Sequence, residues 1–137
     1  MELIYLYKYL LAFLWLPLIL FTSGCTSSTQ EEQEYGISSI NAEIPIPKNA
    51  KEIEVTTTSS NPNIKIGVKY ELDNIGGEQG LYRPDNYFNK LEDAGWVELE
   101  DKRLGHVQFF EKEGTVIAIE IHEDTFDIHE MNKDAKY

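Results

Sequence analysis

The sequence predicts an α+β fold: an antiparallel sheet of about five strands with one helix packed on a face, in the order β-β-α-β-β-β. Several segments alternate apolar and polar residues, which is typical of strands. A single stretch with helical spacing of apolar residues lies between two groups of these segments. With 42% hydrophobic and 12% aromatic residues, the chain can bury one small core.

The first two strands are predicted to form an antiparallel hairpin. Residues 52–58 alternate, so that Ile53 and Val55 share a face that we expect to be half-buried. Residues 64–72 give the clearest strand pattern, and its apolar face consists of Ile64, Ile66, Val68, Tyr70 and Leu72. The polar residues between these segments favour a turn.

The helix is predicted at residues 84–94, after a glycine-rich loop at 73–81. Its apolar stripe consists of Tyr87, Phe88, Leu91 and Ala94. Gly95 suits the left-handed residue that follows a last helical turn, and Trp96 can then fold back onto the stripe.

Further strands are expected at residues 97–101, 106–111 and 115–122, with a short sixth strand at 126–128. The loop between the second and third of these decides which side chains share a face. A two-residue turn would place Phe109 on the same face as Ala118. A three-residue loop, with Gly114 in the left-handed position, places Phe109 with Ile117 instead, and we favour this register.

In the favoured register, the outer face of the sheet is more apolar than an ordinary solvated face. It carries His106, Gln108, Phe110, Val116, Ala118, Glu120 and His122. We interpret its centre, Phe110, Val116 and Ala118, as a candidate surface for a protein partner. The alternative is that the loop at 73–81 or the C-terminal segment covers this face.

An apolar leader precedes the one cysteine of the chain. Residues 9–21 are apolar, and three small residues come directly before Cys25. This pattern resembles the lipobox of bacterial and archaeal lipoproteins. The resemblance implies cleavage after Gly24 and acyl chains such as palmitate on Cys25. The alternative is an uncleaved transmembrane anchor, because residues 3–21 could almost cross a bilayer.

The resulting layout is a signal peptide at 1–24, a lipidated cysteine and polar tether at 25–43, a single α+β domain at 44–130 and a tail at 131–137. The domain would lie outside the cytoplasm, held at the cell membrane by the lipid. The net charge of -12 argues against nucleic acid as a partner. Residues 87–96 also resemble a helix ending of small uncharacterised lipoproteins, which implies a similar fold and no particular activity.

The acidic segment from His122 to Glu130 is the one candidate for metal binding. It holds two histidines and four carboxylates, but it has neither helical pairing of histidines nor a calcium-loop spacing. We therefore predict no metal and no cofactor. No catalytic motif is present, so we do not expect an enzyme.

The expected function is that of a lipid-anchored accessory or binding module of the cell envelope, with an envelope protein as its candidate partner. The alternative is a small hydrolase or metal-binding lipoprotein that uses the segment between His122 and His129.

Overall fold

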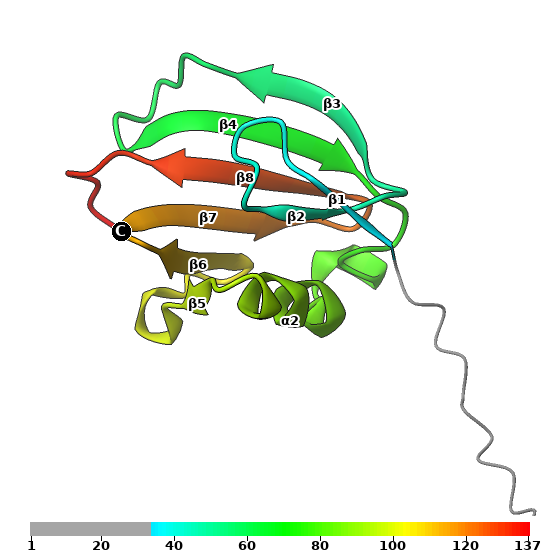
Figure 1. Ribbon diagram of the computed structural model, residues 1–137. Coiled ribbons are helices and arrows are strands. Elements are labelled where there is room, and N and C mark those ends of the chain that lie inside the picture. The colour runs from blue at the N-terminus through cyan, green and yellow to red at the C-terminus, as the bar shows by residue number, and fades with distance from the viewer. Residues whose placement is uncertain (1–33) are drawn as a thin grey trace, which may run out of the picture. The chain divides into compact units, whose positions relative to one another are not determined.

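A computed structural model describes residues 34–137 (Figure 1). Within these residues the expected α+β class is confirmed, with one α-helix and two antiparallel sheets. In the described residues the order is β1 (Tyr35–Ile37), β2 (Pro45–Pro47), β3 (Lys51–Thr56), β4 (Ile64–Glu71), α2 (Asp85–Asp93), β5 (Val97–Glu98), β6 (Val107–Lys112), β7 (Thr115–Ile121) and β8 (Thr125–Met131). Two short 3-10 turns, Glu78–Gly80 and Glu100–Lys102, flank the helix and β5.

The strand count and order differ from the prediction. Six strands form one antiparallel sheet in the order β3-β4-β8-β7-β6-β5, and β1 pairs with β2 in a separate sheet (Figure 1). The hairpin of β3 and β4 is confirmed. The segment expected to be a short sixth strand is instead the seven-residue β8, which lies between β4 and β7 in the middle of the sheet.

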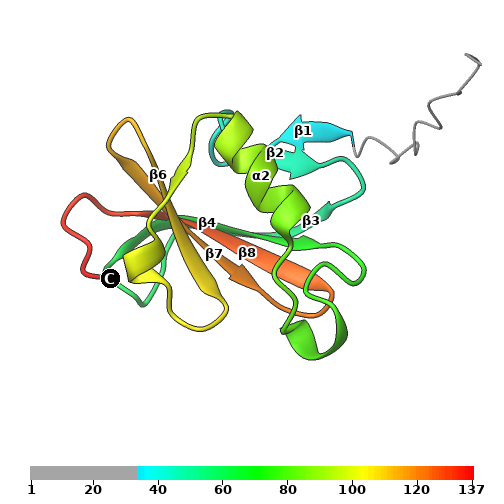
Figure 2. The same cartoon turned by 90° about the horizontal axis from the view of Figure 1, so that it is seen from below.

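The folded part begins ahead of residue 44. β1 lies in the segment that was expected to be a tether, and its three residues pair with the proline-flanked β2. Ile44 and Ile46 are buried in the core, and the indole nitrogen of Trp96 donates to the carbonyl oxygen of Glu43 at 3.0 Å. The small sheet and α2 therefore cover the same face of the large sheet (Figure 2).

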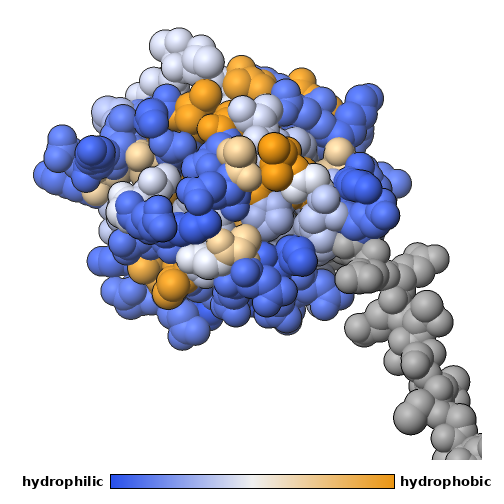
Figure 3. Space-filling model, in the orientation of Figure 1, coloured by the Kyte–Doolittle hydropathy of each residue, from blue (hydrophilic) through white to orange (hydrophobic). Residues whose placement is uncertain are grey.

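No helix of residues 34–137 lies on the opposite face of the large sheet (Figure 2). We call it the outer face. Figure 3 shows the side covered by α2 and the small sheet, which is largely hydrophilic with separate apolar patches.

α2 confirms the predicted helix and its ending. Tyr87, Phe88 and Leu91 are buried against the sheet. Gly95 has a φ of 92°. The amide of Trp96 donates to the carbonyl of Leu91 at 3.0 Å, and that of Gly95 to Glu92 at 2.9 Å. These two bonds are the Schellman pattern, which satisfies the last carbonyls of the helix and turns Trp96 into the core.

None of the helices in residues 34–137 combines the length and the apolar character that a membrane span requires.

β3 is more exposed than its alternation predicted. Ile53 and Val55 are 47% and 42% exposed. β3 is an edge strand, and its pairing with β4 is irregular between Glu52 and Glu54. A half-buried strand was the wrong expectation here, because nothing in the described residues covers this edge deeply enough to enclose these side chains.

The expected register of β6 against β7 is wrong. Lys112 pairs with Thr115, so the connecting turn has two residues, Glu113 and Gly114. Both have positive φ, 50° and 78°, as in the type I′ turn that suits the twist of a hairpin. Phe110 therefore enters the core beside Phe88, with ring centroids 5.3 Å apart.

The glycine-rich loop after β4 packs directly on the turn between β7 and β8. The amide of Gly76 donates to the carbonyl of Glu123 at 3.1 Å, and that of Asn74 to the carboxylate of Asp124 at 2.7 Å. A Cβ atom at Gly76 would overlap the carbonyl oxygen of His122. Glycine is required at this position because two backbone segments approach too closely for a side chain.

We expect Gly76→Ala to lower the free energy of unfolding by about 3 kcal/mol, because the added methyl group must push the loop away from the β7–β8 turn. Urea unfolding would measure the change. The matched control is Gly36→Ala in β1, whose Cβ would lie 3.9 Å from the nearest atom and should cost little. Equal stability of the two variants would contradict the close packing.

Candidate metal centre

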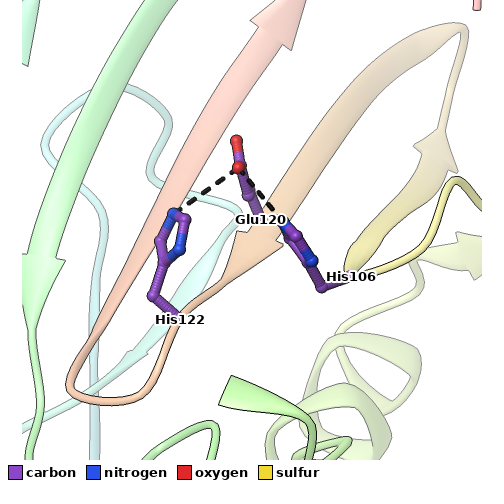
Figure 4. Close-up of side chains that lie close together, drawn as sticks. All are labelled: His106, Glu120 and His122. Carbon is purple, nitrogen blue, oxygen red and sulfur yellow. Dashed lines mark ion pairs between the residues drawn. The ribbon is translucent and has the colours of Figure 1, made fainter. Parts of the chain in front are cut away.

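Three side chains that can bind a metal ion meet at one end of the outer face (Figure 4). Glu120 belongs to β7, and His122 follows its last residue. Their spacing of two places both side chains on the same face, because successive strand residues point to opposite sides. The third residue, His106, comes from the turn that precedes β6.

The position of His106 depends on this tight turn. The backbone groups of Leu104 and Val107 hydrogen-bond to each other in both directions at 3.0 Å. Gly105 within the turn has a φ of 61°, a conformation that glycine adopts without steric cost. The carbonyl of His106 accepts a bond from the amide of Ile121 at 3.1 Å, which fixes His106 next to the end of β7.

Two of the three distances in this cluster are close to the spacing of metal ligands. The Nε2 atoms of His106 and His122 lie 3.4 Å and 3.5 Å from the same carboxylate oxygen, Oε1 of Glu120. These separations exceed an ordinary N–H···O bond. Ligand atoms at about 2.0–2.2 Å from a tetrahedral zinc ion lie about 3.3–3.6 Å from one another. One ligand atom from each residue lies within 4.8 Å of the others.

The cluster is open to solvent. The side chains of His106, Glu120 and His122 are 55%, 34% and 41% exposed. An ion could therefore reach them without any movement of the fold. Three protein ligands also leave the fourth position of a tetrahedral ion free for water or another ligand.

A second carboxylate, that of Asp127 on β8, lies next to His122. Oδ2 of Asp127 on β8 is 3.5 Å from Nε2 of His122 and 3.4 Å from Nζ of Lys69 on β4. Asp127 pairs with Glu120 across β8 and β7, so both carboxylates project from the outer face. Their negative charges make this end of the face attractive to a cation, and Lys69 offsets part of the effect.

The sequence analysis placed His106, Glu120 and His122 on one face, but for a reason that the register does not support. Glu120 and His122 share a face through strand alternation. His106 joins them through the turn at residues 104–107. The metal alternative considered from the sequence used His129 instead. In the structure His129 lies farther along β8, opposite Ala118 and Gly67, and is not part of the cluster.

The three residues of the expected partner surface do not share a face. Phe110 is fully buried in the core. Ala118, opposite Phe109, and the half-buried Val116, opposite Glu111, lie on the outer face. The displacement of Phe110 into the core follows from the two-residue turn.

The C-terminal segment contacts the outer face, as the alternative interpretation proposed. The ring of Tyr137 stacks on Phe109, with centroids 4.9 Å apart and planes 16° from parallel. The side-chain amide of Asn63 donates to the carbonyl of Lys136 and accepts from the backbone amide of Lys136, both at 3.2 Å. Cys25, the expected lipidation site, lies outside the described residues.

An ion cluster around a buried carboxylate lies close to the candidate metal centre, since Arg83, Arg103 and His106 line the same pocket. Arg83 makes a bidentate contact with Glu98, at 3.0 Å and 2.8 Å, and Nε of Arg103 donates to the same carboxylate at 2.6 Å. The Glu98 side chain is only 5% exposed. Burial opposes its ionisation, but the hydrogen bonds and charges of both guanidiniums outweigh this and lower the pKa of Glu98 to about 2.

Comparison with known proteins gives no relative from which a role could be inferred: no protein-family model, curated protein or solved structure matches the chain. The fold and the cluster of His106, Glu120 and His122 are therefore the basis for a functional conclusion.

The low pKa of Glu98 predicts a specific loss of stability in acid. A carboxylate whose pKa falls from its ordinary value near 4.5 to about 2 on folding stabilises the protein above pH 4.5. This contribution disappears as the pH falls towards 2. We expect Glu98→Gln to lose on the order of 2 kcal/mol at pH 7 and to flatten the pH dependence of unfolding in this range.

Urea unfolding at pH 7, 4.5 and 2.5 would measure both effects. Glu100→Gln is the matched control, since Glu100 is 78% exposed and 3.6 Å from Arg103. This substitution should change the free energy of unfolding little at any of the three pH values. A Glu98→Gln protein with the same pH dependence as the parent would contradict the assignment.

Proposed function

We propose that this chain is a lipid-anchored, extracytoplasmic binding module of the cell envelope whose folded domain binds a divalent transition-metal ion. His106, Glu120 and His122 are the ligands, and Zn²⁺ is the ion that suits them best. The proposal concerns binding and does not require catalysis.

The placement of two imidazole nitrogens around one carboxylate oxygen carries this proposal. Their distances to Oε1 of Glu120, 3.4 Å and 3.5 Å, are close to the edge length of a zinc coordination tetrahedron. Imidazole ligands favour zinc, copper and nickel over calcium and magnesium, which take oxygen ligands. Since two of the three ligands are imidazoles, a hard cation is a poor fit.

The charge of the chain supports uptake of a cation. The net charge is -12, so the field around the domain attracts positive ions. Close to the centre, Asp127 adds a negative charge 3.5 Å from His122. Zinc bound by two neutral histidines and the Glu120 carboxylate keeps one net positive charge. The nearby carboxylate of Asp127 would stabilise that charge.

The anchor part of the proposal depends on the sequence around Cys25. The apolar leader and the small residues before Cys25 support lipidation at that position. A protein partner of the envelope stays part of the proposal, but a partner surface formed by Phe110, Val116 and Ala118 does not, because Phe110 is in the core.

Zinc titration tests the metal centre. We expect isothermal titration calorimetry on residues 34–137 fused to a soluble leader, and on the full chain in detergent, to give one saturable site. His106→Ala and Glu120→Gln should each weaken it at least about tenfold. Zinc at 100 times its dissociation constant should stabilise the fold by about 2.7 kcal/mol.

The control is His129→Gln, since His129 is a histidine of the outer face that is outside the cluster. It should bind zinc like the parent. If His129→Gln abolished binding and His106→Ala did not, the ion would belong to the segment between His122 and His129. No saturable binding to the parent protein would end the metal proposal.

The intact mass of protein extracted from membranes tests the anchor. We expect a chain that starts at Cys25 and carries the mass of acyl groups, and Cys25→Ser should release the protein from the membrane fraction. An unmodified chain that still starts at Met1 would replace the lipid with a transmembrane anchor.

A further inference from the structure

A pocket of about 360 Å³ adjoins the metal centre. One wall is the loop with Leu81 and Tyr82, and the other is the turn with Gly105 and His106. His106 therefore belongs to both the metal centre and the pocket wall. The volume is near the lower end for small-molecule sites, which suits a ligand of about one ring or one amino acid.

The two sites are held together by backbone packing. The amide of Tyr82 donates to the carbonyl of Gly76 at 2.7 Å, and Gly76 bonds to Glu123 at 3.1 Å. A Cβ atom at Gly80 would lie 3.1 Å from the backbone of His122 and of Glu123. The pocket wall thus rests on the same turn that carries His122, so pocket and metal centre form one preformed unit.

The pocket combines an apolar wall with one buried polar group. Leu81 and Tyr82 are 81% and 60% exposed, so their apolar surfaces are free to contact a ligand. Gln108 also lines the pocket. It is 8% exposed, and its Oε1 atom is buried without a hydrogen-bond partner. Because Oε1 is enclosed by the protein, the apolar wall is the surface of the pocket that a ligand would contact.

The cations of the pocket are already neutralised. Arg83 and Arg103 line it, but both bond to Glu98, and Arg83 bonds to Asp85 at 2.7 Å as well. An anionic ligand would find no net positive charge there unless the neighbouring metal ion were bound. The anionic group of a ligand therefore has to be the metal-binding end.

We infer that the zinc-loaded domain binds a small organic anion with an apolar or aromatic body. Its anionic head, a carboxylate or a similar oxygen ligand, takes the fourth position at zinc. Its body lies against the exposed side chains of Leu81 and Tyr82. This inference rests on the proposed zinc site and names the class of ligand that the site takes.

Two hydroxamates with the same metal-binding head provide the test. Acetohydroxamate has the head and a methyl group, whereas benzohydroxamate adds a ring of a size that fits the pocket. We expect calorimetry on the zinc-loaded protein to show at least tenfold tighter binding of benzohydroxamate, and the zinc-free protein to bind neither compound.

Variants of the pocket wall separate the contribution of the ring to affinity from that of the metal-binding head. Leu81→Ser and Tyr82→Ser should remove the tenfold advantage of benzohydroxamate, with the affinities for zinc and acetohydroxamate unchanged. Ile37→Ser is the matched control, because Ile37 is 68% exposed and lies in β1 away from the pocket lining. This substitution should leave the affinities for zinc, acetohydroxamate and benzohydroxamate unchanged.

The possible failures are distinguishable. Equal affinity of both hydroxamates for the zinc-loaded parent would overturn the pocket inference and leave the zinc site standing. Binding of benzohydroxamate to the zinc-free protein would also overturn it, since the head would then not need the ion. Absence of zinc binding itself would overturn the proposed function together with this inference.

Discussion

The register between β6 and β7 is the constraint on which both the core and the metal centre depend. The turn at Glu113 and Gly114 sets it, because both residues adopt the positive φ of a two-residue hairpin. A shift by one residue would exchange the two faces of β6. In the observed register Phe110 packs on the helix, and the start of β6 lies beside the end of β7, where the three metal-binding side chains meet.

Elements with strong local patterns could be predicted from the sequence. The alternation of β4 and the spacing and glycine ending of α2 need no knowledge of distant residues. β8 was underestimated because it contributes only Phe126 and Ile128 to the buried core, and the residues around them in the strand are mostly polar. β1 was missed because three residues become a strand only through pairing with β2.

The metal centre was harder to predict than the fold for a related reason. Glu120 and His122 are neighbours in the chain, and their shared face follows from strand geometry. His106 comes from another segment, and its position depends on a turn whose geometry is tertiary information. The sequence therefore drew attention to the histidine nearer in the chain, His129, which the sheet places elsewhere. A glycine directly before His106 was the one local signal of that turn.

The exposed edge at β3 has a consequence for a protein crowded on a surface. A membrane anchor of the proposed kind concentrates molecules in two dimensions, where unpaired strand edges can template pairing between neighbouring copies. β3 has features that hinder such pairing: the irregular register between Glu52 and Glu54, and a run of charged residues with Lys51. The net charge of -12 makes neighbouring copies repel each other, which further opposes pairing at this edge.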